Sequence, residues 1–396
     1  MKYEASNQCL ILAGGYGSRL GTITKNTPKP LIKINNKPFI LYLIKNLYRQ
    51  GIKNFIILSY YKNSNFKKKK LKFFRDAKIK IIKEQSKLGT LGSVINAKKY
   101  LKKSFFVVNG DSYFDFNIRD LEFNTFKYKK KIGVSLTKIE SKLPKIAYEF
   151  KNKKLNKISS TTKKEKFICG GVYYFKKNIL GGFDKKILDI DKDLILKVKH
   201  KKFIFAKYYS SKFLDIGTPK DLKRSSTFLK KNIIKPCAFL DRDGVINKDL
   251  GHVHTPKQTK WKKNIFNAIK YLNDNNYRVI ILTNQAGIAK GYYTEKTFFN
   301  YSKWFLNQFL NKGSFIDQIY FSPFHPDGKI KKFRKKTNLR KPGNGMIISA
   351  CKDWEIDKKK SFLIGDRDTD VLAGKKSSLK SFLVEENIYA QIKKLT

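Results

Sequence analysis

The chain has 396 residues, enough for two or three domains of about 150 residues, each with its own hydrophobic core. Hydrophobic residues make up 41% and aromatic residues 14% of the sequence, which excludes a disordered polymer although the formal net charge is +55. Ten of the 86 basic residues are Arg and the other 76 are Lys, spread along the whole chain. Arg is the residue that binds phosphates in a bidentate manner and hydrogen-bonds to bases. Because few of the basic residues are Arg, we interpret the positive charge as a solvated surface and expect no nucleic-acid partner.

The four cysteines lie far apart in the sequence, so they indicate neither a disulfide framework nor a Cys-x-x-Cys metal site. No apolar run approaches the length that spans a bilayer, and the first residues lack the basic and then apolar pattern of a secretory signal. We therefore expect a cytoplasmic protein without a membrane partner.

Strand-like apolar runs alternate with amphipathic, Lys-faced helical stretches in the first half of the chain. In chain order they predict a strand at 9–12, a helix at 39–50, a strand at 55–59, a helix at 92–101 and a strand at 105–109. This βαβ order predicts a mainly parallel sheet covered by helices on both faces.

The series begins again after a polar stretch at 220–236. The second half predicts strands at 237–240, 278–282, 316–321 and 361–364, with helices at 265–273 and 295–310. We predict two doubly wound α/β domains, residues 1–232 with a Rossmann-like mixed sheet and residues 233–396.

A glycine-rich loop follows the first predicted strand. Gly14, Gly15 and Gly17 let the backbone bring its N–H groups close to a polyphosphate. Arg19 and Lys29 add positive charge where a leaving pyrophosphate collects negative charge. The loop has neither the Gly-Lys-Ser/Thr of a P-loop nor the third glycine of a dinucleotide fingerprint, so it predicts another kind of nucleotide site.

Joined to the Thr-Pro-Lys-Pro-Leu segment at 27–31, this loop resembles the sugar-phosphate nucleotidyltransferases, and the resemblance covers about residues 8–228. Segments at 88–92, 109–111, 170–173 and 215–219 match the family in the same order. The resemblance implies that a sugar 1-phosphate attacks the α-phosphorus of a nucleoside triphosphate and releases pyrophosphate. It also implies that Gly89 and Thr90 contact the nucleotide and that Gly171 lies on the sugar side.

The same resemblance implies a magnesium site between Asp111 and Asp215, each at the end of a strand. Carboxylate oxygens are the ligands that Mg²⁺ prefers. Arg19 and Lys29 then act as the catalytic cations that offset the charge of the two polyanions.

Two carboxylates, Asp241 and Asp243, follow the predicted strand at 237–240. In phosphoryl transfer the first can attack phosphorus to give an aspartyl phosphate, while the second protonates the departing alcohol and later activates water. An Asp-x-Asp-Gly segment can also begin a calcium loop, but His252 occupies the twelfth position, where such a loop needs Glu.

Three further segments complete the predicted phosphatase site. They contribute Thr283, Asn284, Arg340, Lys341 and Asp366. We expect the first two to hydrogen-bond the phosphoryl group and the two cations to neutralise it. We expect Asp366 to hold Mg²⁺ together with Asp241 and Asp243.

In this order the segments resemble the haloacid dehalogenase superfamily over about residues 236–390. The strings at 241–247, 251–256, 283–288, 291–295 and 340–342 are most similar to the D,D-heptose 1,7-bisphosphate 7-phosphatases, with the histidinol-phosphate phosphatases nearby. Many members carry a Cys/His zinc loop, but the corresponding stretch at 322–339 has His325 and no cysteine. One His without thiolates cannot close a zinc site, so we expect no structural zinc.

The two resemblances imply consecutive reactions. A phosphatase that removes the 7-phosphate of heptose 1,7-bisphosphate leaves heptose 1-phosphate, the kind of substrate that a sugar-1-phosphate nucleotidyltransferase consumes. We therefore predict a bifunctional, Mg²⁺-dependent enzyme that makes a nucleotide-activated heptose, with GTP as the nucleotide because the segments resemble those of heptose 1-phosphate guanylyltransferases.

Two alternatives stay open from the sequence. The same chemistries could act on another sugar 1-phosphate, such as mannose 1-phosphate, and on another phosphomonoester, such as histidinol phosphate. A polyanion-binding protein with vestigial sites is the other alternative, but binding a polyanion gives no role to the strand-end carboxylates.

Overall fold

The computed structural model describes residues 3–71, 74, 76–138, 147–151, 154–159, 167–181, 183, 188–196 and 203–396. The chain divides into two compact units, Met1–Lys230 and Lys231–Thr396. Each unit is an α/β fold with helices on both faces of a sheet, which confirms the predicted fold class.

The main sheet of the N-terminal unit is mixed, as predicted. Its strands in the described residues follow the order β10-β9-β11-β6-β1-β4-β5, and β8 pairs with β11 and β12. Strands β1, β4, β5 and β6 run parallel, whereas β11 is antiparallel to β6 and β8. The strands are β1 Gln8–Leu12, β4 Asn54–Ser59, β5 Lys78–Lys83, β6 Ser104–Asn109, β8 Ile132–Lys138, β9 Ala147–Lys151, β10 Lys154–Ser159, β11 Phe167–Lys176 and β12 Ile204–Tyr208.

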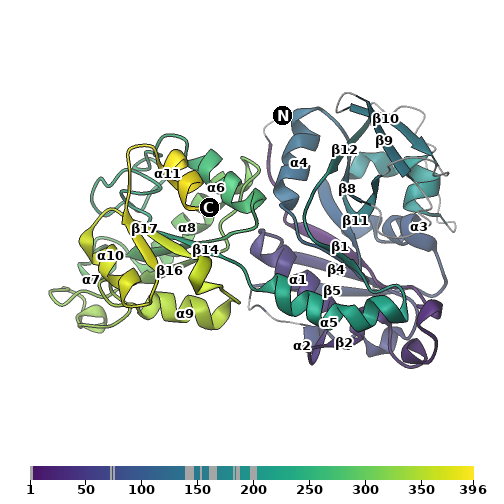
Figure 1. The fold of residues 1–396 in the computed structure, drawn as a ribbon, viewed down its shortest axis with the longest axis horizontal. Helices are drawn as coiled ribbons and strands as arrows, with labels where there is room; N and C mark the ends of the chain where they lie inside the picture. Colours follow the sequence, from purple (N-terminus) through teal and green to yellow (C-terminus); the bar gives the residue numbers. More distant parts are fainter. Residues whose placement is uncertain are drawn as a thin grey trace. The chain divides into compact units, whose positions relative to one another are not determined.

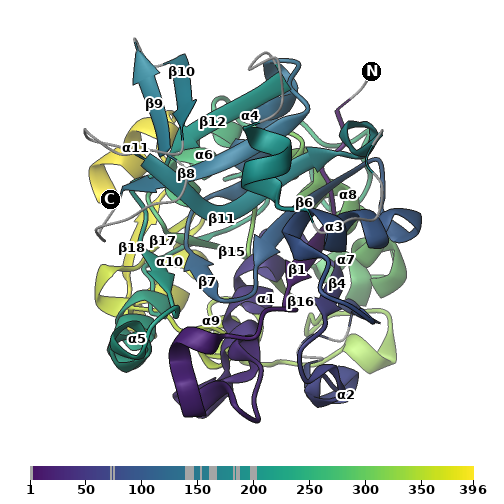
Figure 2. The ribbon, with the colours of Figure 1, turned by 90° about the vertical axis from the view of Figure 1, so that its right-hand side faces the viewer.

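Helices cover both faces of this sheet. Successive residues of a strand point to opposite faces, so Cys9 and Ile11 of β1 pack with α1 and α4, while Leu10 packs with α3. Figure 2 shows the parallel neighbours β1 and β4 within this unit. The helices and the short strands outside the main sheet are α1 Phe39–Arg49, α2 Lys68–Leu71, α3 Gly89–Asn96, α4 Ile118–Lys127, α5 Pro219–Ile233, β2 Lys33–Ile34, β3 Lys37–Pro38, β7 Ser112–Phe114 and β13 Phe213–Asp215.

Helix α3 differs from the prediction at both ends. It begins at Gly89 and ends at Asn96, after which the chain tightens into a 3₁₀ turn over Lys98–Tyr100. The apolar run therefore covers two short elements rather than one helix at 92–101.

The sheet of the C-terminal unit is parallel throughout, in the order β16-β15-β14-β17-β18. Helices α6, α8 and α11 cover one face, and α9 and α10 cover the other (Figure 1). The elements are β14 Cys237–Leu240, α6 Ile265–Asp274, β15 Arg278–Asn284, α7 Ala286–Ala289, α8 Glu295–Leu310, β16 Gln318–Ser322, α9 Gly345–Asp353, β17 Phe362–Gly365, α10 Asp368–Lys375, β18 Lys380–Leu383 and α11 Ile388–Leu395. A parallel sheet brings the carboxyl ends of its strands to one edge. Asp241 and Asp366 directly follow β14 and β17, and Thr283 and Asn284 are the last two residues of β15.

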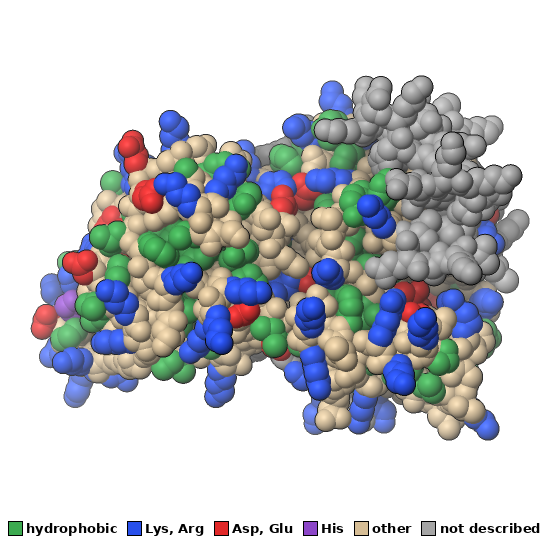
Figure 3. All heavy atoms as spheres, in the orientation of Figure 1, with side chains coloured by type: hydrophobic (Ala, Val, Ile, Leu, Met, Phe, Trp, Pro, Cys, Tyr) green, Lys and Arg blue, Asp and Glu red, His purple; other side chains and the backbone are tan. Residues whose placement is uncertain are grey.

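Basic side chains are scattered over the face drawn in Figure 3 rather than gathered in one patch, with fewer acidic side chains among them. Among the described residues, no helix has both the length and the apolar character needed to cross a membrane.

Candidate active sites

A cavity of about 470 Å³ opens at the carboxyl edge of the N-terminal sheet, next to the end of β1. Its wall includes the predicted nucleotide-binding residues Gly14, Gly15, Gly17, Gly89 and Thr90. Ligands of open α/β sheets bind outside the carboxyl ends of the strands, so the place of this cavity suits a nucleotide.

The turn at Gly17 needs glycine. Its φ is +69°, and a Cβ there would lie 2.9 Å from Cγ2 of Thr24. Thr24 Oγ1 in turn donates to the carbonyl of Gly17 at 3.1 Å, which closes the loop on itself. The chain can therefore pass close to the cavity at this point without a side chain in the way.

Lys29 and Asp111 meet in the wall of the cavity. Lys29 Nζ lies 2.9 Å from Asp111 Oδ2, and the lysine is only 7% exposed. A buried ammonium that is already positioned supplies positive charge without a reorganisation step.

Asp215 comes to Asp111 through the pairing of β13 with β7, in which the Ile216 amide donates to the Asp111 carbonyl at 3.0 Å. Arg19 Nη2 and Asp215 Oδ1 both lie 3.2 Å from the position of a Cβ on Gly217. Burial, and then the charge of Asp111, raise the pKa of Asp215 to about 6 against the lowering effect of its basic neighbours.

These two carboxylates fit Mg²⁺. Asp215 Oδ1 is buried and accepts no hydrogen bond, and after burial the charge of Asp111 contributes most to raising the pKa of Asp215. A hard cation with oxygen ligands would satisfy both groups. Arg19, Asp215 and Gly171 are not part of the wall of the cavity; Gly171 lies against the side chain of Asn109 instead.

A second cavity, of about 410 Å³, lies at the carboxyl edge of the C-terminal sheet. All the residues predicted for the phosphatase site line it: Asp241, Asp243, Thr283, Asn284, Arg340, Lys341 and Asp366.

Three carboxylates converge in this cavity. Oxygens of Asp241, Asp366 and Asp370 all lie within 4.8 Å of one another. Lys341 Nζ lies 2.9 Å from Asp241 Oδ1 and also contacts Asp370. Burial raises the pKa of Asp241 to about 7 although Lys341 lowers it. One lysine leaves an excess of negative charge among three carboxylates, and this donor set fits Mg²⁺.

The sequence placed carboxylates for Mg²⁺ in the segment 365–370, but of these we named Asp366 and not Asp370, which is 1% exposed. It lies in the first turn of α10, four residues after Asp366. The available signal was this spacing, because residues four apart can face one site when the intervening chain turns into a helix.

The turn after the two aspartates also needs glycine. Gly244 has a φ of +84°, and a Cβ there would lie 2.3 Å from Asp366 Oδ2. The absence of a side chain therefore lets the loop after β14 close on the carboxylate after β17.

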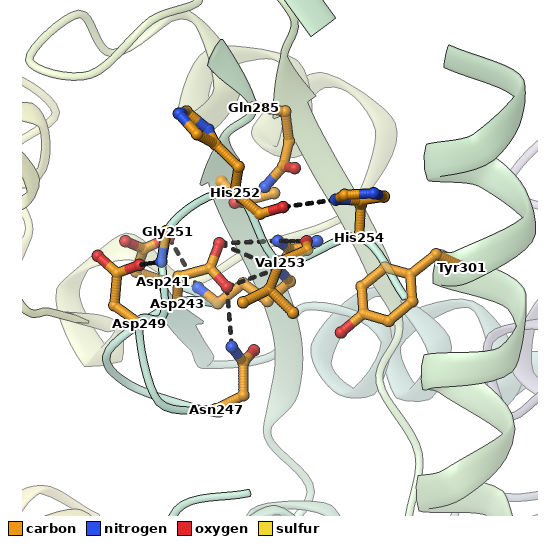
Figure 4. Close-up of polar contacts among 12 residues, drawn as sticks. Asp241, Asp243, Asn247, Asp249, Gly251, His252, Val253, His254, Gln285 and Tyr301 are labelled. Carbon is orange, nitrogen blue, oxygen red and sulfur yellow. Dashed lines mark hydrogen bonds and ion pairs between the residues drawn. The ribbon is translucent and has the colours of Figure 1, made fainter. Parts of the chain in front are cut away.

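Asp243 does not belong to the group of three carboxylates. Its oxygens accept hydrogen bonds from Arg242 Nη2 at 2.8 Å and from Asn247 Nδ2 at 2.8 Å (Figure 4). Arg242 is 1% exposed and also donates to the carbonyl of Val253 at 2.6 Å. These contacts fix the Asp243 carboxylate in the wall of the cavity, and its roles as proton donor and metal ligand stay predictions.

The Asn284 side chain holds the backbone of Lys341. Its Oδ1 accepts from Lys341 N at 3.0 Å, and its Nδ2 donates to Lys341 O at 3.2 Å. Lys341 Nζ also donates to the carbonyl of Leu282 at 2.9 Å. The Asn284 amide therefore holds the lysine backbone, and because Asn284 also lines the cavity, its contact with the phosphoryl group stays a prediction.

His252 and His254 take separate places. His252 lines the cavity, whereas the ring of His254 stacks on Tyr293 with 4.5 Å between centroids. His254 Nδ1 lies 2.7 Å from the carbonyl oxygen of His252, as Figure 4 shows. The backbone contact uses one ring nitrogen, so the two rings do not converge as a pair of metal ligands.

The segment that corresponds to the zinc loop is held by other contacts. Arg334 donates to the carbonyls of Gly328 at 2.6 Å and Lys329 at 3.3 Å, and Phe333 is buried with Ile288 and its neighbours. His325 Nδ1 accepts from the Asp327 amide at 3.1 Å. The absence of zinc stays a prediction. These hydrogen bonds and the buried Phe333 hold the segment in the structure.

We expect Arg334→Ala to lower the free energy of unfolding of the C-terminal unit by about 1 kcal/mol, because two backbone carbonyls lose a charged donor. Hydrogen exchange of the 322–339 amides should become faster. Arg334→Lys should not restore protection, since an ammonium cannot fork onto two carbonyls. Lys336→Ala is the matched control in the same loop, and equal exchange in the Arg334 and Lys336 variants would contradict the role of Arg334.

Comparisons with known proteins agree with both predicted activities. The nucleotidyl transferase family model matches residues 8–232, and the HAD-hydrolase-like model matches residues 338–394. The chain is 40% identical over 158 residues to the D-glycero-alpha-D-manno-heptose-1,7-bisphosphate 7-phosphatase of Photorhabdus laumondii, covering 40% of this chain and 86% of that protein. It is 40% identical over 151 residues to the D-glycero-beta-D-manno-heptose-1,7-bisphosphate 7-phosphatase of Rhodopseudomonas palustris, covering 38% of this chain and 84% of that protein.

The structure also resembles a putative glucose-1-phosphate thymidylyltransferase from Bacillus anthracis, with a TM-score of 0.50 and 20% identity. The likeness covers 56% of this chain and 94% of that one, and it concerns the fold. The chain belongs to the nucleotidyl transferase family and carries a second, HAD-like phosphatase unit after it, so it is an enzyme with two activities.

Proposed function

We propose that the chain makes a nucleotide-activated heptose in two steps. The C-terminal unit removes the 7-phosphate of D-glycero-D-manno-heptose 1,7-bisphosphate, and the N-terminal unit joins the resulting heptose 1-phosphate to GMP from GTP. The observation that carries this proposal is the 40% identity of the phosphatase unit to two heptose bisphosphate phosphatases over at least 84% of their length. The product keeps the 1-phosphate, which is the group that a sugar-phosphate nucleotidyltransferase uses as its nucleophile.

In the phosphatase step, an oxygen of Asp241 attacks the phosphorus and the bond to the sugar oxygen breaks. Asp243 gives its proton to that oxygen, then takes a proton from water as the water attacks the aspartyl phosphate. Phosphate leaves and the Asp241 carboxylate is restored. Mg²⁺ held by the carboxylates of either site would supply Lewis-acid stabilisation of the phosphoryl oxygens.

The basic residues in the wall of the phosphatase cavity favour a substrate with a second phosphate. Besides Lys341, the cavity is lined by Lys290, His325, Arg340 and Arg367. Partial burial, then Arg340 and Lys290, lower the pKa of His325, and burial and Arg367 lower that of Arg340. Such mutual repulsion among cations is relieved by a bound dianion.

Histidinol phosphate carries a single phosphate and an ammonium group, so these cations disfavour it. We expect kcat/KM for heptose 1,7-bisphosphate to exceed that for histidinol phosphate by at least about 100-fold, as one unpaired charge contact is worth roughly 2–3 kcal/mol. Initial rates of phosphate release from the two compounds measure this ratio. Equal values would remove the support for a bisphosphate substrate.

In the nucleotidyl transfer step, the sugar phosphate oxygen attacks the α-phosphorus in line and pyrophosphate leaves. No covalent intermediate with the protein is required. Lys29 and Arg19 offset the negative charge that moves onto the leaving group, and the glycine loop binds the polyphosphate through its backbone.

Glu84 favours guanine as the base. It is 4% exposed and lines the nucleotide cavity, and its Oε1 is buried and accepts no hydrogen bond. Burial raises the pKa of Glu84, so a ligand that donates to this carboxylate stabilises it. Guanine presents two adjacent donors, N1–H and the 2-amino group, whereas uracil and thymine present one and cytosine and adenine present an acceptor at the equivalent ring nitrogen.

We expect Glu84→Gln to lower kcat/KM for GTP by about 10- to 100-fold, because an amide oxygen accepts from one donor where the carboxylate accepts from both. The values for UTP and CTP should change by less than about 3-fold. Tyr60→Phe, in the same wall and hydrogen-bonded to Tyr16 rather than to Glu84, is the control for disturbance of the cavity. A wild-type enzyme that prefers another base, or a uniform loss over all bases, would contradict the role of Glu84.

A further inference from the structure

A chain of buried hydrogen bonds stands behind Thr283 in the phosphatase cavity. Tyr293 Oη donates to Gln285 Oε1 at 2.6 Å, and Gln285 Nε2 donates to Thr283 Oγ1 at 2.7 Å. Thr283 is 1%, Gln285 2% and Tyr293 7% exposed. All three residues line the cavity, and neither carboxylate nor cation takes part in the chain.

Only one direction of donation along these hydrogen bonds gives every buried donor an acceptor. In the observed orientation of the Gln285 side-chain amide, Tyr293 donates to Gln285 and Gln285 donates to Thr283. The Thr283 hydroxyl accepts this bond, so its own proton is available to donate to a group in the cavity. With the amide reversed, Gln285 would donate to Tyr293, and the buried phenol proton would have no acceptor in the described part of the chain. A buried donor without an acceptor costs roughly 1–3 kcal/mol.

Other contacts fix the two residues behind Thr283. The backbone N–H of Gln285 donates to the backbone carbonyl of Ser322 at 2.8 Å, which joins Gln285 to the end of β16. The Tyr293 ring stacks on His254 with an interplanar angle of 17°. The side-chain hydrogen bonds of these two residues lead to Thr283, and the double variants below separate an effect through Thr283 from a direct contact with the substrate.

We propose that Gln285 and Tyr293 are positioning residues of the phosphatase reaction, which set the rotor of the Thr283 hydroxyl so that it donates to the transferring phosphoryl group. A hydroxyl can rotate to accept or to donate. Negative charge on the phosphoryl oxygens needs a donor, and a donor set in advance stabilises the transition state without reorganisation. The proposal rests on the phosphatase activity but not on the identity of the sugar.

The test uses the intact chain with Mg²⁺ and p-nitrophenyl phosphate, whose hydrolysis does not depend on recognition of a sugar. Tyr293→Phe removes the donor that orients the amide, and Gln285→Met removes the amide itself. We expect each variant to lower kcat by about 10-fold with KM changed by less than about 2-fold. Inhibition by orthovanadate, which imitates the five-coordinate phosphoryl group, should weaken by a similar factor.

Double variants separate positioning from a structural role. Thr283→Val should lower kcat by about 100-fold, and adding Tyr293→Phe to it should cause no further loss, because no hydroxyl is left to orient. Thr283→Ser keeps the hydroxyl, so Tyr293→Phe should again cost about 10-fold in that background. Tyr320→Phe is the control: it removes a phenol that donates to Asp353 at 2.8 Å, outside the cavity.

Thermal unfolding identifies a variant that fails to fold. If Tyr293→Phe or Gln285→Met fails in this way, the other substitution is combined with the Thr283 variants in its place. The proposal is wrong if Tyr293→Phe costs the same factor with and without the Thr283 hydroxyl, if the loss appears in KM, or if both variants hydrolyse p-nitrophenyl phosphate at the wild-type rate. Failure of the heptose assignment would leave all these results unchanged.

Discussion

Asp241→Asn is expected to lower kcat for phosphate release by about 10⁴-fold, because an amide cannot form the aspartyl phosphate and loss of a nucleophile has effects of this size. The substitution keeps the size of a side chain that is buried against Lys341 and Asp370. Phosphate release from heptose 1,7-bisphosphate by the full chain measures the effect.

Nucleotidyl transfer by the same protein, supplied directly with heptose 1-phosphate and GTP, should be unchanged in this variant. Asp274→Asn, at an exposed pair with Lys270 on α6, is the matched control and should leave both activities intact. Normal phosphate release by the Asp241 variant would refute its assignment as the nucleophile.

Asp215→Asn should have the reciprocal effect. We expect kcat for pyrophosphate release to fall by about 10³-fold, because the site loses one of the two carboxylates that would hold Mg²⁺. Phosphate release should stay at the wild-type rate. Pyrophosphate and phosphate are measured separately, with heptose 1-phosphate and heptose 1,7-bisphosphate as the respective substrates.

Stability distinguishes a chemical from a structural loss in this variant. Burial raises the pKa of Asp215 to about 6, so at pH 7.5 the folded protein carries the cost of a buried charge that the unfolded chain does not. A neutral amide removes that cost, and Tm should be equal or higher. Asp221→Asn, whose side chain contacts Thr218 and Arg224 instead, is the control; a matching loss of activity there would contradict the assignment.

Local patterns were sufficient to predict the elements that position both sites. The strand at 237–240 and the helix at 295–310 have the predicted bounds, because an uninterrupted apolar run and a 3.6-residue period are visible in the sequence. The aspartates after β6 and β14 were predictable for the same reason, since Asp241 directly follows a buried strand and Asp111 follows one after a single glycine.

Contacts between distant segments could not be read in this way. Glu84 stands out only through its buried oxygen in the cavity wall, and Asp370 only through its approach to Asp241. The use of the Asn284 amide by the Lys341 backbone joins residues 57 apart in the chain. Such roles depend on which polar atoms are left without a partner after folding, and local sequence patterns do not contain that information.

The central claim is that one chain performs two consecutive steps, and a coupled assay tests it most directly. The intact protein is incubated with heptose 1,7-bisphosphate, Mg²⁺ and each nucleoside triphosphate in turn, and the products are identified by mass. We predict GDP-heptose, phosphate and pyrophosphate with GTP, and accumulation of heptose 1-phosphate when GTP is withheld. Recovery of the bisphosphate unchanged, or of heptose 1-phosphate with no nucleotide attached in any reaction, would contradict the account.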